Sequence, residues 1–291
     1  MIWLFAAFLS AIIFGLGSFL LTLGSHKNYP ESIMLLGLYI AGSIIFLGTL
    51  LSHHDISFDR YILFFSILVG LGSYYGNSFL VKAFDLGPAC LAAPLMNISV
   101  LLVILLSCYI YHENIANYQY VGIGCIVAGA SLLGCNFKNT IIKSKFWIVF
   151  VILAIIAIFM REGGLKIAFE AGVNNFSVLF YGYAFATGLA ILTFYKQQYI
   201  SPTLTATSIP QVTTKKTQAF VLGSLVGICS SIGLGLLAYA ITCGPASVII
   251  PIFSARSIVT VLLIVFFLKE KLFLFQWIAI SFIIAGTFFI T

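Results

Sequence analysis

One arginine stands inside a long run of apolar residues, where a charge is costly. Arg256 lies ten residues into the run Ala246–Leu268. As a helix rising ~1.5 Å per residue, this run would place Arg256 about 15 Å deep, near the middle of a bilayer. A guanidinium at that depth costs about 2.5–3.5 kcal/mol unless it faces water or a partner. Its planar fork suits a carboxylate or phosphate, so Arg256 is either a binding group for an acidic ligand or half of an internal ion pair.

The acids that could partner this arginine, or carry a proton, belong to a second charged cluster. Arg161 and Glu162 fall late in the apolar run Phe146–Lys166. Lys166 and Glu170 follow Glu162 at spacings of four and eight, so these three side chains share one helix face. Glu162 is either a carboxylate that couples transport to protons or the partner of Lys166 at the end of the run. Lys166 and Glu170 are expected at the membrane surface.

Polar side chains in three other apolar runs could line a binding cavity. Their hydroxyl, phenol and amide groups can hydrogen-bond a ligand, but such residues also let helices pack closely or bond to one another. The candidates are Tyr74, Tyr75, Asn77, Asn97, Ser230 and Ser231. Ser73-Tyr74 and Ser230-Ser231 occupy equivalent positions in the internal repeat described below, which favours Tyr74 and Ser230 as cavity residues.

Two prolines lie about five residues into apolar runs, Pro94 in Ala89–Tyr111 and Pro251 in Ala246–Leu268. A proline inside a membrane helix frees a backbone carbonyl and bends the helix, and the freed group must find a partner or line a cavity. The two prolines are therefore either a symmetric gate of kinked helices beside a central cavity, or helix-entry residues that fit the turns before them.

Composition places the chain in a membrane. Hydrophobic residues make up 62% of it and charged residues 8%, against about 25% charged in soluble domains. Ten apolar runs are long enough to cross a ~30 Å hydrocarbon core as helices. The runs are Ile2–Leu23, Glu31–Leu51, Tyr61–Val81, Ala89–Tyr111, Tyr118–Cys135, Phe146–Lys166, Phe176–Tyr195, Ala219–Ala240, Ala246–Leu268 and Phe273–Thr291. The connections are short except for Lys196–Thr217, which is expected to be a flexible loop.

The C-terminal parts of the two halves repeat each other at a shift of 157 residues. Ala83, Gly87, Pro88, Pro94, Glu113 and Gln119 recur as Ala240, Gly244, Pro245, Pro251, Glu270 and Gln276. Five crossings per copy would make the second copy enter the membrane from the opposite side. We therefore predict an all-α integral membrane protein of ten transmembrane helices in two inverted-topology five-helix repeats, residues 1–137 and 138–291. Both chain ends are expected on one face, opposite the lysine-rich cytoplasmic connections.

The repeated pattern resembles that of the drug/metabolite transporter superfamily, in particular its ten-helix EamA-like family. The pattern is Ala83-x3-Gly87-Pro88-Ala89-x4-Pro94, followed by His112-Glu113-Asn114 and Gln119-x9-Gly129. The resemblance is clear over Ala83–Leu133 and Ala240–Ile290. The glycine that usually precedes the glutamate of the family is replaced by His112 and Lys269. The resemblance implies carriers of amino acids, other metabolites or toxic compounds, often exporters.

The expected function is secondary transport of small metabolites, by default amino or organic acids, by alternating access across the inner (cytoplasmic) membrane. The first run, Ile2–Leu23, has no ionisable group, which excludes the proton–cation exchange that small multidrug members perform with a carboxylate there. The alternatives are a multidrug or toxic-compound exporter of the same fold and a membrane-embedded lipid-modifying enzyme using Arg161 and Glu162. We expect no catalytic residue, cofactor or metal, no nucleic-acid partner, and a monomer surrounded by lipid that binds a small-molecule substrate.

Overall fold

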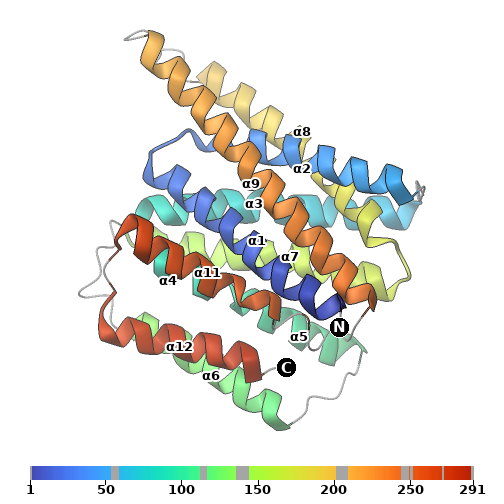
Figure 1. The fold of residues 1–291 in the computed structure, drawn as a ribbon, viewed down its shortest axis with the longest axis vertical. Helices are drawn as coiled ribbons and strands as arrows, with labels where there is room; N and C mark the ends of the chain where they lie inside the picture. Colours follow the sequence, from blue (N-terminus) through green and yellow to red (C-terminus); the bar gives the residue numbers. More distant parts are fainter. Residues whose placement is uncertain are drawn as a thin grey trace.

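The computed structural model describes residues 2–53, 59–111, 117–135, 144–200, 209–243, 249, 252–270 and 272–289. Regular secondary structure in these ranges is helical (Figure 1). The elements are α1 (Ile2–His26), α2 (Glu31–His53), α3 (Arg60–Leu86), α4 (Ala89–Leu95), α5 (Ile98–Tyr111), α6 (Asn117–Cys135), α7 (Phe146–Glu170), α8 (Asn175–Ile200), α9 (Ile209–Cys243), α11 (Arg256–Leu263), the π-helix η3 (Ile264–Leu268) and α12 (Leu274–Phe289).

Seven helical stretches in the described part of the chain are long and apolar enough to cross a membrane. Two shorter apolar helices, Ile252–Leu268 and Trp277–Gly286, accompany them. The outer surface of the bundle carries large apolar side chains, among them Phe5, which is 71% exposed, and Phe266, which is 80% exposed. A continuous apolar exterior of this kind fits contact with lipid rather than water. The multi-pass membrane character predicted from composition is therefore confirmed, whereas the count of ten crossings stays a prediction.

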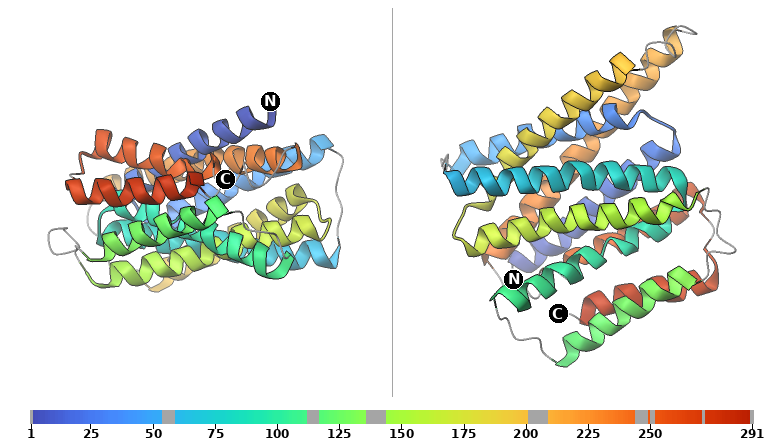
Figure 2. Two further views of the ribbon diagram at one scale, coloured as in Figure 1. Left: turned by 90° about the horizontal axis from the view of Figure 1, so that it is seen from below. Right: turned by 180° about the vertical axis from the view of Figure 1, so that it is seen from behind.

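The helices pack in matched pairs. The long helix α3 lies along α7, and α1 lies along α9; α2 also contacts α9, and α3 contacts α8. By their order in the two halves, α1 corresponds to α7, α2 to α8 and α3 to α9, so each of these contacts has a counterpart in the other half. The shift of 157 residues places α3 on α9. The last expected helix of each half, α6 and α12, pack together at one edge of the bundle (Figures 1 and 2). The start of α1 and the end of α12 lie on the same side.

Two expected spans contain interruptions at nearly equivalent positions. The helix α4 ends at Leu95, and α5 begins at Ile98 after the turn at Met96 and Asn97. In the other half, residues 252–254 are helical, Ala255 is a turn residue and α11 follows directly. Under the 157-residue shift Ala255 corresponds to residue 98, so the two breaks lie one residue apart in the repeat. Pro94 lies in the last turn of α4, directly before its break, and Pro251 lies outside the described residues.

The repeated glutamate of the second half has a structural role in the first half. The carboxylate of Glu270 accepts hydrogen bonds from the backbone nitrogens of Ala89 and Cys90, at 3.4 Å and 3.1 Å. These nitrogens belong to the first turn of α4, where backbone N–H groups have no partner within the helix. The Gly-Pro turn and the glutamate, which recur together in the sequence, therefore meet across the two halves at this helix start.

The segment Lys196–Thr217, expected to be a loop, is helical at both ends. The helix α8 continues to Ile200 and α9 begins at Ile209, and these ends project together beyond the other helices (Figure 1). Lys and Gln are good helix formers, so the helices extend past the apolar part of each span even though the sequence becomes polar. Residues 201–208 lie outside the described residues.

Candidate functional site

Arg256 lies inside the bundle and forms an ion pair. It is the first residue of α11 and is 6% exposed. Its Nη2 donates a hydrogen bond to Oε1 of Glu162 on α7 at 2.8 Å. The guanidinium carbon lies 4.2 Å from the ring centre of Phe253 and 5.0 Å from that of Phe14, so both aromatic faces contribute to holding the cation. The internal ion pair, one of the two predicted roles, is thus present in this structure.

A second arginine binds the same carboxylate. Arg161, the neighbour of Glu162 on α7, is 3% exposed and donates from Nη2 to Oε1 of Glu162 at 3.1 Å. Two guanidinium cations therefore share one carboxylate, which leaves a net charge of +1 on these three side chains. We refer to Arg161, Glu162 and Arg256 as the Arg–Glu–Arg cluster. Lys166, the other predicted partner of Glu162, pairs with Glu170 at 2.6 Å further along α7.

The remaining carboxylate oxygen contacts the first half of the protein. The hydroxyl of Ser99, in the first turn of α5, lies 2.9 Å from Oε2 of Glu162 and 2.7 Å from the carbonyl oxygen of Met96, so its one proton serves both acceptors. Ser99 was not among the predicted site residues. The signal that could have found it is its position, 157 residues before Arg256, because equivalent positions in two repeats can meet at the axis between them. One carboxylate is thus bound by matching positions of both halves.

Two close helix contacts, each made at a glycine, position the backbone that carries the two arginines. At Gly72 of α3, a Cβ atom would lie 2.6 Å from both the carbonyl oxygen of Ala157 and the backbone nitrogen of Arg161. At Gly15 of α1, a Cβ would lie 2.8 Å from the carbonyl oxygen of Arg256. These distances are far below ordinary contact, so only glycine lets α3 and α1 approach the backbone that carries the arginines.

The cluster retains unused hydrogen-bond donors. Nη1 of Arg256 and Nε of Arg161 are buried and have no hydrogen-bond partner among the described residues. A buried donor left unpaired is costly, more so when it carries charge. Each of these groups can therefore take an acceptor from a bound molecule. The unpaired donors and the surplus positive charge would both be compensated by an anion at the cluster.

Both arginines line one cavity, which we call the arginine cavity. Its cavity volume is about 40 Å³, and the space between atoms around it, open solvent included, is about 580 Å³. Its polar wall is formed by Asn77, Ser230, Ser257 and Thr260 in addition to the arginines, and its apolar wall by residues such as Phe14, Phe84 and Met96. Such a mixture of an apolar wall and a few polar groups is typical of sites for small organic ligands.

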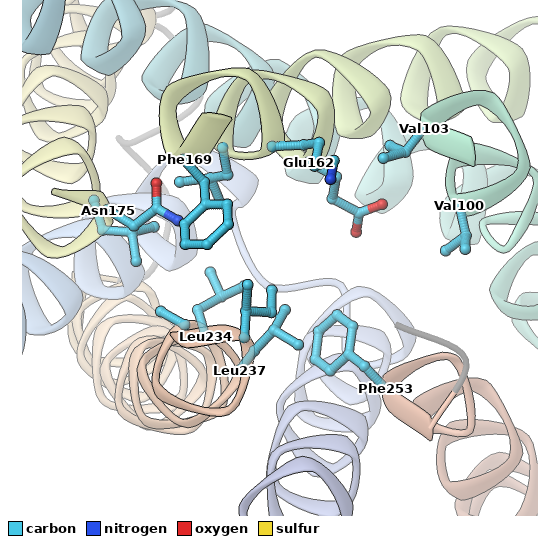
Figure 3. Close-up of a pocket in the computed structure, with 13 residues that line it drawn as sticks. Val100, Val103, Glu162, Phe169, Asn175, Leu234, Leu237 and Phe253 are labelled. Carbon is cyan, nitrogen blue, oxygen red and sulfur yellow. The ribbon is translucent and has the colours of Figure 1, made fainter. Parts of the chain in front are cut away.

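Glu162 lines a second cavity, which we call the Glu162 cavity. Its cavity volume is about 70 Å³, within about 770 Å³ of space between atoms that includes open solvent. Leu234, Leu237 and Phe253 lie across it from the carboxylate (Figure 3). Asn175 and Lys166 are its other polar residues, and the rest of its wall is apolar.

The two cavities follow one another along the helices. On α7, Arg161 of the arginine cavity precedes Phe169 of the Glu162 cavity; on α9, Ser230 precedes Leu237. The Arg–Glu–Arg cluster borders both cavities, with its cations on one and its carboxylate on the other.

The structure brings some of the predicted polar residues to the arginine cavity. Asn77 and Ser230 line it, and the amide nitrogen of Asn77 donates to the hydroxyl of Tyr39 at 2.9 Å. Asn97, in the break between α4 and α5, donates to the hydroxyl of Ser257 at 3.0 Å. This last bond joins the interruption of one half to α11 of the other.

Other predicted residues lie away from the two cavities. The hydroxyl of Tyr74 is 2.7 Å from that of Thr193 on α8. Tyr75 is 44% exposed on the outer surface. Ser231 donates to the carbonyl of Gly227 within α9 at 2.7 Å. In this structure these three side chains therefore serve contacts between or within helices, or face outward.

The comparisons with known proteins agree with this architecture. Residues 1–135 match the EamA-like transporter family. No curated protein sequence matches this chain. One solved structure, described only as the crystal structure of a protein, is similar with a TM-score of 0.61 and 16% sequence identity, over 97% of this chain and 94% of the other. At that identity the similarity shows the fold alone. The family match agrees with the resemblance seen in the repeated motifs: residues 1–135 are similar to the EamA-like transporter family, which is part of the drug/metabolite transporter superfamily.

Proposed function

We propose that this protein is a secondary transporter of small metabolites that carry an acidic group, such as organic acids or amino acids, across the cytoplasmic membrane. The family match over residues 1–135 and the apolar helices support a membrane transporter of the drug/metabolite type. The observation that carries the substrate class is the Arg–Glu–Arg cluster, because its surplus positive charge and unpaired donors border a cavity. A lipophilic cation would be repelled there, which argues against export of cationic drugs.

Arg256 is the residue proposed to receive the acidic group. Its guanidinium fork can bind a carboxylate through two parallel hydrogen bonds, and one of its two terminal nitrogens, Nη1, has no hydrogen-bond partner among the described residues. Asn77 and Ser230, in the same cavity, are placed to bond the rest of a polar headgroup. The apolar residues of the wall would accommodate the remainder of the molecule.

Transport is proposed to proceed by alternating access between two inverted five-helix halves, residues 1–137 and 138–291. Three features support this arrangement: the matched helix contacts, the nearly equivalent breaks before α5 and α11, and the two cavities stacked on either side of the cluster. Rocking of one half against the other would open the cluster toward one cavity mouth and then toward the other. The proposed working unit is a monomer in lipid.

The test is transport of labelled organic and amino acids in vesicles that contain the purified protein. Arg256→Ala should abolish uptake or efflux of acidic substrates, and Arg256→Lys should restore little because it lacks the fork. Arg60→Ala is the matched control, since Arg60 lies at the exposed start of α3, away from both cavities. Unchanged transport of every acid by the Arg256→Ala protein would exclude this role.

A further inference from the structure

We propose that Glu162 is a tethered occupant of the anion site: its carboxylate holds the position that the acidic group of the substrate takes during transport. The substrate is then a monoanionic acid with an apolar body, which displaces this side chain. This inference rests on the proposed function. It adds that Glu162 competes with the substrate for the anion site and that the substrate carries one negative charge.

The first support is the way in which the carboxylate is bound. Oε1 of Glu162 accepts hydrogen bonds from Arg256 and Arg161, at 2.8 Å and 3.1 Å. Oε2 accepts from the hydroxyl of Ser99 at 2.9 Å. These groups come from α11, α7 and α5, so the carboxylate is surrounded by three helices. Guanidinium groups and a hydroxyl arranged around both oxygens are what a carrier would present to a free carboxylate ligand.

The second support is the position of the helix ends. Ser99 is the second residue of α5 and Arg256 the first residue of α11, so each interrupted helix binds the Glu162 carboxylate through a side chain of its first turn. The N-terminal end of a helix carries partial positive charge and favours an anion. In carriers with interrupted helices, such ends face the anionic group of the substrate. In this structure they face a side chain of the protein itself.

The third support is the balance of charge and donors. With Glu162 in place the cluster keeps a charge of +1, and the buried atoms Nη1 of Arg256 and Nε of Arg161 have no hydrogen-bond partner among the described residues. A monoanion that takes the place of the Glu162 carboxylate keeps the charge of the site at +1, as it is with Glu162 bound. A zwitterion in the same place would raise the charge to +2, so the charge count selects a monoanion.

The cavities provide a route for the exchange. Both arginines line the arginine cavity, so an anion that enters it reaches their side chains first. Glu162 borders the other cavity, so its side chain can turn into that space when the incoming acid takes its hydrogen bonds (Figure 3).

A built-in competitor has a measurable consequence. The apparent affinity for an external anion is reduced by the fraction of time for which the site is vacant. Glu162→Gln keeps the size of the side chain and removes its charge, so the anion should bind at least about tenfold more tightly to this variant than to the natural protein.

The experiment measures binding of 3-phenylpropanoate, a monoanion with an apolar ring, to the purified full-length protein by isothermal titration calorimetry. The variants are Glu162→Gln, Arg256→Gln and the double variant Arg161→Gln/Glu162→Gln, which keeps the charge of the natural cluster and so remains informative if the single variant does not fold. Arg161→Gln is the reference for the double variant. The matched control is Glu170→Gln, the same change in the ion pair with Lys166 at the end of α7.

The expected result is tighter binding to Glu162→Gln and to the double variant relative to its reference, unchanged binding to Glu170→Gln and no binding to Arg256→Gln. Equal or weaker binding to the folded Glu162 variants, with the natural protein still binding through Arg256, would overturn the competitor role and leave the proposed function standing. If neither the natural protein nor any variant binds this anion or other organic acids, both the inference and the proposed function fail.

Discussion

Ser99 and Arg256 occupy the same position in the two halves of the chain, 157 residues apart, and bind opposite oxygens of the single carboxylate of Glu162. The duplication therefore shows itself in the site as well as in the packing of the helices. The two positions have diverged in chemistry: one half supplies a hydroxyl and the other a cation. An asymmetric pair of this kind can hold a single anion near the axis between the halves.

Loss of the hydrogen bond from Ser99 to Glu162 should measurably lower the free energy of unfolding. Ser99→Ala removes a buried donor to a charged acceptor, which typically costs about 1.5–3 kcal/mol of unfolding free energy. Chemical unfolding in detergent would detect this loss. Ser52→Ala is a suitable control, because Ser52 is exposed and bonds only to the carbonyl of Gly48 in its own helix among the described residues. An equal effect of the two changes would contradict the importance of Ser99.

The charge of the cluster predicts a preference between two ligands with the same skeleton. 3-Phenylpropanoate and phenylalanine differ by the ammonium group, so the monoanion should bind more tightly. One uncompensated unit charge at roughly 6 Å contributes about 2–3 kcal/mol at an effective dielectric constant near 20, which corresponds to well over tenfold in affinity. Competition between the two compounds measures the ratio directly. Tighter binding of phenylalanine would indicate an amino acid carrier whose ammonium group has a partner of its own.

Because α3 and α7 approach closely at Gly72, we expect a larger residue at this position to destabilise the protein. In Gly72→Ala, the new Cβ would lie 2.6 Å from backbone atoms of Ala157 and Arg161, so the helices must separate. Overpacking of this kind costs about 1–3 kcal/mol, and because Arg161 moves with its helix, anion binding should weaken as well. In Gly48→Ala a Cβ meets nothing within 4 Å, and this control should be as stable as the natural protein or slightly more stable. Normal anion binding by Gly72→Ala would show that the cluster tolerates a shift of α7.

The contact of Glu270 with the start of α4 predicts a link between the halves. Glu270→Ala leaves the backbone nitrogens of Ala89 and Cys90 without this acceptor, which should lower the unfolding free energy by about 0.5–2 kcal/mol, the usual effect of losing a helix cap. Glu170→Ala, which removes only a pair between neighbouring turns of one helix, should cost about 0.3–0.5 kcal/mol. Unfolding of both variants in detergent gives the comparison. A smaller effect at Glu270 than at Glu170 would argue against a structural role for the repeated glutamate.

Much of the architecture was predictable from the amino-acid sequence. In lipid, a long apolar run can hydrogen-bond its own backbone groups only as a helix. The presence of membrane helices therefore follows from the composition. The repeat of Gly-Pro, proline and glutamate at a fixed shift identified which helices correspond. The cost of burying a lone guanidinium also required that Arg256 find a partner or a wet cavity, whatever the details of the fold.

Only the tertiary structure decided which partner Arg256 has and which faces of the helices point inward. Glu162 was one of several acids, and its selection depends on how α7 and α11 meet. Tyr75 and Asn77 lie two residues apart on α3, yet one faces outward and the other lines the arginine cavity. The sequence could not separate them because lipid is as apolar as the helix interior, so a membrane helix carries no strong periodic signal for its buried side. The direction of each side chain is fixed by helix rotation, which close contacts such as that of Gly72 with α7 set in three dimensions.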